Sequence, residues 1–180
     1  MRRVLDALQP VVMAFAIFMM VYLFLFQPHK VDGRSMVPSF QDKEYILTDK
    51  ISYYKGDPQR GDVIVFHAPP PNDADFIKRI IGLPGETIMV QRGRVYINGQ
   101  ALPEVYLPMD LRTSEKAFLR EGVPYHIPLD YYIVFGDNRN FSSDSREWGP
   151  ISRSAIVGKA LVRYWPPSRA GIIPHERYSI

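Results

Sequence analysis

The first segment whose residues could do chemistry spans residues 33–39 (GRSMVPS), where Ser35 is a candidate nucleophile. Taken alone, such a Gly/Ser/Pro sequence is typical of an ordinary turn. A serine becomes an effective nucleophile when a neighbouring base takes its proton. The segment therefore predicts a catalytic site only if the rest of the chain supplies such a base.

The second segment, residues 76–81 (FIKRII), carries two basic side chains within an apolar strand. Side chains alternate between the faces of a strand, so Lys78 lies on one apolar face and Arg79 on the other. An edge strand whose long side chains reach water is the structural alternative. If Lys78 is buried instead, desolvation lowers its pKa and makes a neutral amine available as a general base. Arg79 cannot act in this way, because a guanidinium stays charged.

The third segment is a polar run at residues 136–146 (GDNRNFSSDSR), directly after a predicted apolar strand. It resembles a calcium-binding loop only superficially, because its carboxylates are wrongly spaced and no terminal bidentate glutamate follows. A solvated surface loop is one interpretation. The density of Asp, Arg and Ser also suits an ordered network of ion pairs and hydroxyls that positions neighbouring groups.

The composition excludes several other classes of site. The chain of 180 residues has no cysteine, so disulfides, thiolate metal sites and a cysteine nucleophile are excluded. Its net charge of +3 is mild and its basic residues are scattered, so we expect no nucleic-acid partner. The histidines (His29, His67, His126 and His175) lack metal-ligand spacing, and none lies in a segment that looks like a site. We therefore expect neither a metal nor a cofactor.

Residues 7–26 form an apolar segment without a charged residue. Because about 20 apolar residues span a bilayer, we predict one transmembrane helix there. The alternative is a cleaved secretory signal, but no small-x-small cleavage site follows the apolar run. A buried helix of a soluble domain would show a polar stripe, which this segment lacks.

The charges that precede this segment predict its orientation. Arg2 and Arg3 leave residues 1–6 in the cytoplasm under the positive-inside rule, and residues 27–180 then lie outside. Ser35 follows the end of the apolar segment closely, within about 30 Å of the membrane surface even if the link is extended. A nucleophile there could reach a bond just outside the bilayer.

The rest of the chain predicts a mostly β domain, folded into sheets or a partly open barrel. Runs rich in β-branched and aromatic residues indicate strands at residues 62–66, 76–81, 87–91, 94–97, 131–135 and 160–164. The pair Asn98-Gly99 predicts a type I′ hairpin turn. The proline-rich run 68–73 predicts a surface loop. Residues 103–128 could form a longer loop or an inserted cap, with a helical turn near 113–119.

In this order, the segments resemble the bacterial type I signal peptidases. The resemblance covers nearly the whole chain and consists of the apolar anchor, residues 33–38, 60–66 (RGDVIVF), 77–79 with 82–85 (GLPG), and 136–139 with Ser142 and 144–146. It implies a membrane-bound serine endopeptidase that removes signal peptides from exported preproteins after Ala-x-Ala sites. It also implies the family's β-rich catalytic core, with a small cap at about residues 100–125.

The resemblance implies a role for each matching residue. Ser35 would be the nucleophile and Lys78 the general base, acting through an acyl-enzyme. Ser142 would orient the lysine. The implied structural support is the salt bridge of Asp144 with Arg146 together with Asp137 and Arg139, and the implied substrate-binding residues are Val31, Met36, Asp75, Phe76 and Ile77.

The chain departs from the family's pattern at a few positions. Gly33 stands where some members carry a serine hydroxyl that assists the Ser35 N–H in binding the oxyanion, so no second donor is assigned here. Asn140 and Phe141 stand where Asp and Asn are common, and Ser39 where Thr is frequent. The Asn140 change could remove an ion pair with an arginine in the loop.

The implied partners are secretory preproteins, membrane lipid and the translocation machinery, at the bacterial cytoplasmic membrane with a single span and the N-terminus inside. Two other functions stay open. One is a dedicated maturation peptidase for a single secreted or pilin-like substrate. The other is a membrane-tethered β domain that only binds partners, although the presence of both Ser35 and Lys78 argues against it.

Overall fold

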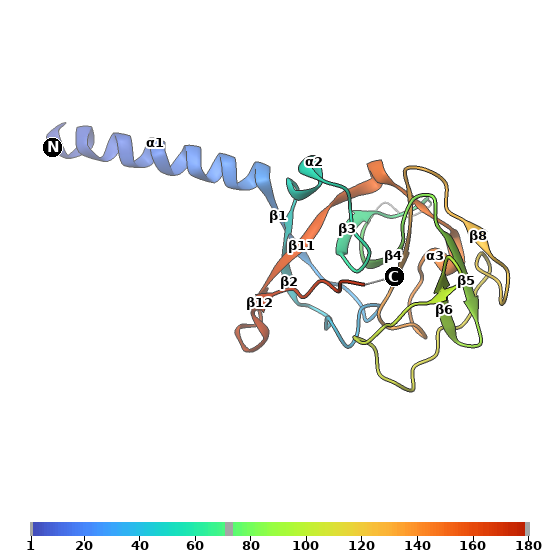
Figure 1. Cartoon of the computed structure of the whole chain (residues 1–180). Coiled ribbons are helices and arrows are strands. Elements are labelled where there is room, and N and C mark those ends of the chain that lie inside the picture. The colour runs from blue at the N-terminus through green and yellow to red at the C-terminus, as the bar shows by residue number, and fades with distance from the viewer. Residues whose placement is uncertain (1, 71–73, 179–180) are drawn as a thin grey trace.

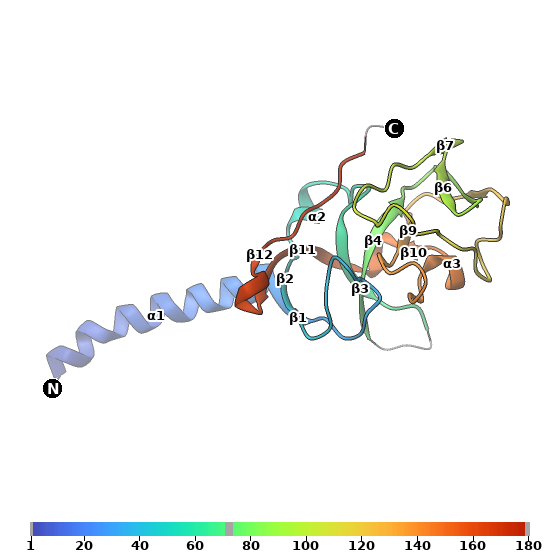
Figure 2. The same cartoon turned by 90° about the horizontal axis from the view of Figure 1, so that it is seen from below.

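A long N-terminal helix leads into a mostly β domain, as the computed structural model in Figures 1 and 2 shows. The structure describes all residues except 1, 71–73 and 179–180. Helix α1 covers Arg2–Leu25 and projects away from the β domain. Among the described residues, no helix combines the length and the apolar character needed to cross a membrane. The span predicted at residues 7–26 is therefore not confirmed.

Strands of the larger sheet follow the order β1-β2-β11-β3-β4-β9-β10, with β12 paired to β11. Their bounds are β1 Phe26–Lys30, β2 Tyr45–Asp49, β3 Val63–His67, β4 Asp75–Gly82, β9 Tyr131–Phe135, β10 Ile151–Ser152, β11 Ile156–Trp165 and β12 Gly171–Ile172. The sheet curls strongly, because His29 on β1 contacts Asp75 on β4 although β2, β11 and β3 lie between those strands.

The smaller sheet has the order β7-β6-β5-β8 and lies beside the larger one (Figure 1). Its strands are β5 Thr87–Gln91, β6 Arg94–Ile97, β7 Gln100–Ala101 and β8 Tyr125–His126. The domain also contains the short helices α2 Ser52–Lys55 and α3 Ser145–Trp148, and 3-10 turns at Arg153–Ala155 and Pro167–Arg169. Between β6 and β7, Asn98 and Gly99 have φ values of 50° and 83°. Positive φ at both positions is what the predicted type I′ turn requires.

Strand β4 is an interior strand, paired with β3 on one side and with β9 on the other. Its second half is buried from Lys78 to Gly82. Ile80 packs into one apolar cluster with Ile64 and Val134, whereas Ile81 packs into another that includes the smaller sheet. Both basic side chains enter the interior, so the alternative in which the long side chains of residues 76–81 reach water is excluded, although residues 75–78 have no partner on the side of β9.

The predicted strands are present as β3, β4, β5, β6, β9 and β11. Strands β1 and β2 were not predicted. In β1, Pro28 breaks the strand pattern, but the edge of a sheet tolerates a residue without an N–H. Of the loop predicted at 68–73, residues 71–73 lie outside the described residues.

The helical turn predicted near residues 113–119 is wrong. The backbone N–H of Thr113 donates to the Gly93 carbonyl at 3.0 Å, and the N–H of Leu119 donates to the Arg146 carbonyl at 3.0 Å. Because tertiary contacts satisfy these backbone groups, the segment needs no helix of its own. Residues 102–120 instead form an irregular segment between β7 and β8.

Candidate active site

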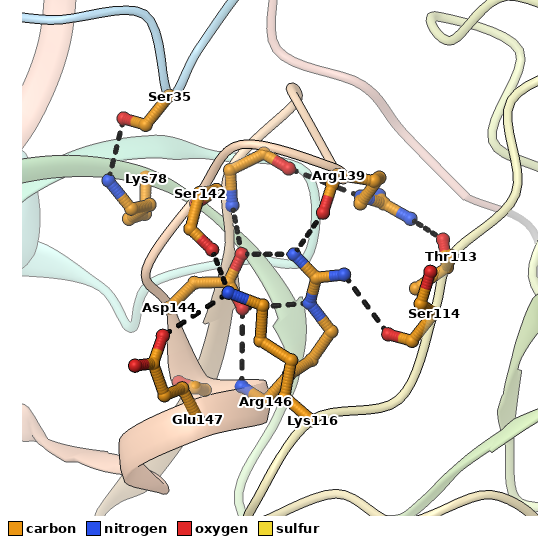
Figure 3. A network of polar contacts seen from close by, with 12 residues as sticks. Ser35, Lys78, Thr113, Ser114, Lys116, Arg139, Ser142, Asp144, Arg146 and Glu147 are labelled. Atoms are coloured by element: carbon orange, nitrogen blue, oxygen red, sulfur yellow. Dashed lines mark hydrogen bonds and ion pairs between the residues drawn. The ribbon is translucent and has the colours of Figure 1, made fainter.

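Ser35 and Lys78 come from different parts of the chain and meet at the centre of the site (Figure 3). The Lys78 Nζ lies 2.8 Å from the Ser35 Oγ, and it also donates to the Ile77 carbonyl at 3.0 Å. Ser35 lies in the turn after β1, whereas Lys78 is in the interior strand β4. The two residue types suit nucleophilic catalysis because the amine is within hydrogen-bond reach of the hydroxyl proton.

The surroundings of Lys78 favour its neutral form. Its side chain is only 4% exposed, and the amine lies 5.2 Å from the centre of the Phe76 ring. Burial lowers the pKa of Lys78 from the ordinary value of 10.5 to about 8, although the charges of Asp144 and Asp137 oppose the shift. A large fraction of the amine is therefore unprotonated at mildly alkaline pH.

The loop after β9 carries a buried ion pair close to Lys78. Arg146 donates to Asp144 through Nε at 2.8 Å and through Nη2 at 2.7 Å, and both side chains are fully buried. Burial by itself would raise the pKa of Asp144, but the hydrogen bonds and charge of Arg146 hold it below its usual value. Figure 3 shows this pair beside Ser142, on the side away from Ser35 and Lys78.

A second buried pair holds the other face of β4. Arg79 donates to Asp137 through Nε at 2.9 Å and through Nη2 at 2.7 Å, and it stacks on the Tyr106 ring at 4.2 Å. The pairing explains how the second basic side chain of the strand enters the interior, since a buried guanidinium needs a charged partner. Asp137 thus links the polar loop to β4.

Arg139 joins the loop to the irregular segment 102–120. Its guanidinium pairs with both carboxylate oxygens of Glu104 and donates to the Tyr106 hydroxyl at 2.8 Å and to Thr113. No sequence motif predicts a role for Glu104, Tyr106 or Thr113. The segment that carries them has no periodicity, so nothing in the sequence indicated that they would meet Arg139.

Ser142 lies next to the dyad, but its hydroxyl is not bonded to the amine. The Oγ is buried without a hydrogen-bond partner among the described residues. It packs against Gly136, where a Cβ would lie 2.2 Å from the Ser142 Oγ and 2.4 Å from the Ser35 carbonyl oxygen. Residue 136 must therefore be glycine, and the predicted orienting hydrogen bond of Ser142 is not formed in this structure.

A cleft of about 500 Å³ opens beside the dyad, and Ser35 and Lys78 are among its lining residues. Four of the predicted substrate-binding residues also line it, namely Val31, Asp75, Phe76 and Ile77. Met36 does not, because it is buried in the core and only 1% exposed.

Asp75 is held at the cleft by two histidines. His67 contacts one carboxylate oxygen at 2.7 Å, and His29 contacts the other at 3.3 Å. His29 also lines the cleft and contacts Thr48 at 2.9 Å. The expectation that no histidine lies at the site is wrong for His29. The sequence could not indicate this, because it is the curl of the sheet that brings His29 on β1 to Asp75 on β4.

Comparison with known proteins gives the family of this chain. A family model described as "Signal peptidase, peptidase S26" matches residues 4–165. Signal peptidase I of Leptolyngbya laminosa is 42% identical over 82% of this chain and 73% of its own length. Signal peptidase IB of Staphylococcus aureus is 34% identical over 92% of this chain and 91% of its own length.

Among solved structures, a signal peptidase I from Enterococcus faecalis is 30% identical, with a TM-score of 0.47 over 58% of this chain and 97% of that chain. The family match and the relatives show that the chain belongs to the signal peptidase family, peptidase S26. It is a serine endopeptidase of the signal peptidase I type.

Proposed function

We propose that this enzyme removes signal peptides from exported preproteins with Ser35 as nucleophile and Lys78 as general base. The observation that carries the proposal is the 2.8 Å approach of the buried Lys78 Nζ to the Ser35 Oγ. A buried amine can serve as a base near neutral pH, which an exposed lysine cannot. Family membership supports the substrate class, since the relatives are signal peptidases.

The proposed reaction needs no group beyond these two side chains and water. The neutral amine accepts the hydroxyl proton through its lone pair, while one of its N–H groups stays bonded to the Ile77 carbonyl. Ser35 attacks the scissile carbonyl and forms an acyl-enzyme. Lys78 then gives the proton to the leaving amine and afterwards takes one from the water that hydrolyses the ester.

The cleft suits an extended peptide. Strand β9 pairs with β4 only from Arg79 onward, so residues 75–78 have one edge without a partner strand among the described residues. A peptide laid along that edge gains main-chain hydrogen bonds beside the nucleophile. Apolar walls from Val31, Phe76 and Ile77 favour small side chains, in line with cleavage after Ala-x-Ala sites.

Membrane association is proposed from the apolar surface of α1. Side chains from 48% to 79% exposed cover the helix, including Val11, Phe15, Phe18, Val21 and Phe24. Exposed apolar area on this scale is unfavourable in water and is typical of a membrane or protein contact. Strand β12 lies on the side of the domain from which α1 leaves, and its Ile172 is 80% exposed. Trp165, at the end of the neighbouring strand β11, is 52% exposed.

Two assays on whole cells test this part of the proposal. Alkaline extraction should leave the wild type in the membrane fraction but release a variant with Val11, Phe15 and Phe18 replaced by serine. Protease added outside the cytoplasmic membrane should digest residues 27–180, as a single span with the N-terminus inside requires. A wild type that extraction releases would contradict membrane anchoring, and a protected catalytic domain would contradict the orientation.

The test of the activity is cleavage of a secretory precursor with an Ala-x-Ala site, followed by mass spectrometry of the products. Wild type in detergent should cut after the −1 alanine, and Ser35→Ala should not cut. If wild type cuts only one secreted or pilin-like substrate among a panel, the enzyme is a dedicated maturation peptidase. Folded wild type that cuts no precursor would contradict the proposal and favour a binding role.

We expect the rate of cleavage to depend on pH through Lys78. The reaction uses the neutral amine, so kcat/KM should rise about tenfold per pH unit below the pKa of about 8 and level off above it. The direction follows from the charge, because protonation below the pKa removes the lone pair. The measurement is kcat/KM for a peptide substrate without titrating side chains, and a profile that is flat from pH 6 to pH 9 would exclude a lysine base.

A further inference from the structure

One residue of the loop after β9, Asn138, holds the turn that carries Ser35. Its side-chain Nδ2 donates to the Arg34 carbonyl at 3.0 Å. Its backbone N–H donates to the Ser35 carbonyl, also at 3.0 Å. The amide group cannot be turned over, because its Oδ1 would then face the Arg34 carbonyl oxygen. Asn138 therefore contacts the carbonyls on both sides of the Ser35 side chain.

The first of these contacts, together with the Val37 N–H that donates to the same Arg34 carbonyl at 3.2 Å, fixes the direction of the Ser35 N–H. The Arg34 carbonyl and the Ser35 N–H belong to the same peptide unit, which is trans. In a planar trans peptide the two groups point in opposite directions. Since the carbonyl points at Asn138, the N–H points away from that loop. It has no hydrogen-bond acceptor among the described residues, so it is free to bind a ligand.

The same contact also strengthens the Ser35 N–H as a donor. A hydrogen bond accepted by a carbonyl polarises the whole peptide unit, which makes its N–H a better donor. A free N–H at the nucleophile is suited to binding the oxyanion that forms when the nucleophile attacks a carbonyl. The effect matters more here because Gly33 carries no hydroxyl that could share the task.

The second contact prevents the turn from rotating. The Ser35 carbonyl lies against Gly136, where no Cβ fits, and accepts the Asn138 N–H. On the other side of the nucleophile, the Gly33 N–H donates to Asp42 Oδ1 at 2.8 Å. With the backbone held at residues 33, 34 and 35, the Ser35 N–H keeps one orientation before substrate arrives.

We propose that Asn138 is a positioning residue for the oxyanion donor: through the Arg34 carbonyl it orients and polarises the Ser35 N–H. The inference rests on the proposed function, in which Ser35 attacks the scissile carbonyl. It assigns the loop of residues 136–138 a part in stabilising the transition state as well as in holding the fold.

The test compares Asn138→Asp with Asn140→Asp in the full-length enzyme in detergent. Asn138→Asp keeps the size of the side chain and the backbone N–H, but it replaces the amide donor with a charged acceptor. Asn140→Asp makes the same chemical change on an exposed residue of the same loop. Since removing an oxyanion donor lowers kcat by about 10²–10³-fold, loss of its positioning should lower kcat by roughly 10- to 100-fold. KM should stay within about twofold.

Two inhibitors separate positioning from a general structural role. A peptide aldehyde adds to Ser35 and places an oxyanion at the same N–H, so its affinity should fall with kcat in Asn138→Asp. An uncleavable substrate-like peptide makes no oxyanion, so its affinity should not change. Asn138→Ala, which adds no charge, should show the same pattern. Asn140→Asp, whose new carboxylate can form an ion pair only within the loop, should match wild type in kcat and in its affinity for both inhibitors.

Three outcomes would overturn the assignment. The first is a kcat of Asn138→Asp equal to that of Asn140→Asp. The second is an aldehyde affinity that does not change while kcat falls. The third is equal loss of affinity for both inhibitors together with a lower melting temperature, which would make Asn138 a structural residue. Retained turnover in Ser35→Ala would contradict the proposed dyad itself, so the two failures are distinguishable.

Discussion

Replacing Lys78 with methionine is expected to lower kcat by about 10³-fold or more, since general-base catalysis contributes about 10²–10⁴-fold and the nucleophile depends on it. Methionine keeps the apolar stem that packs beside Phe76 and removes the amine. The fold should persist with an equal or higher melting temperature, because the buried amine is costly to desolvate. The measurements are single-turnover cleavage of a precursor and a thermal melt of the same preparation.

Two further variants act as controls. Lys78→Arg keeps a cation but offers no lone pair near neutral pH, so it should be as inactive as Lys78→Met. Ser35→Ala removes the nucleophile and should leave the same residual rate, because the two residues act as a unit. An active arginine variant would rule out the neutral base, and near-normal turnover in Lys78→Met would rule out the dyad.

Replacing Arg146 with methionine is expected to lower the free energy of unfolding by about 3–5 kcal/mol, because it leaves the buried Asp144 carboxylate without its partner. For a domain of this size that corresponds to a fall of roughly 6–20 °C in the melting temperature. The unpaired charge should also raise the pKa of Lys78, since Asp144 already acts on it in that direction. The pH profile of cleavage should then move to higher pH.

The matched control is Glu147→Gln. Glu147 pairs with Lys116 at 3.2 Å in the same region (Figure 3), but its side chain is 48% exposed. Exposed pairs contribute about 0–1 kcal/mol, so this variant should melt close to wild type. Adding Asp144→Asn to Arg146→Met removes the uncompensated charge and should recover part of the lost stability. A single Arg146→Met variant that melts within about 2 °C of wild type would contradict the argument.

The sequence by itself indicated six of the eight strands that have four or more residues in the described part of the chain. Strands such as β5 and β9 show β-branched and aromatic runs bounded by turn residues, which is a local signal. The turn at Asn98-Gly99 is likewise encoded by two residues that tolerate positive φ. The sequence also singled out Lys78 over Arg79 as the candidate base, because that choice depends only on the chemistry of the two side chains.

Other features depend on which strands pair and therefore could not be predicted. Strand β1 contains Pro28 and polar residues, and it is a strand only because β2 pairs with it along its length. The contact of His29 with Asp75 requires a curl that brings β1 to β4. Glu104 and Tyr106 meet Arg139 from a segment with no periodicity. Such contacts join residues far apart in the chain, and no local pattern encodes them.

The candidate site likewise has features that the sequence predicts and features that only the tertiary structure sets. The sequence alone determined the residue types that could react: a serine in a turn, a lysine in an apolar strand and a polar loop after another strand. Only the tertiary structure decided that the Ser35 Oγ lies 2.8 Å from the Lys78 Nζ and that Asn138 contacts the turn that carries Ser35. The physical reason is that the alternation of a strand sets which face a side chain takes, whereas its burial and its partners depend on what packs against that face.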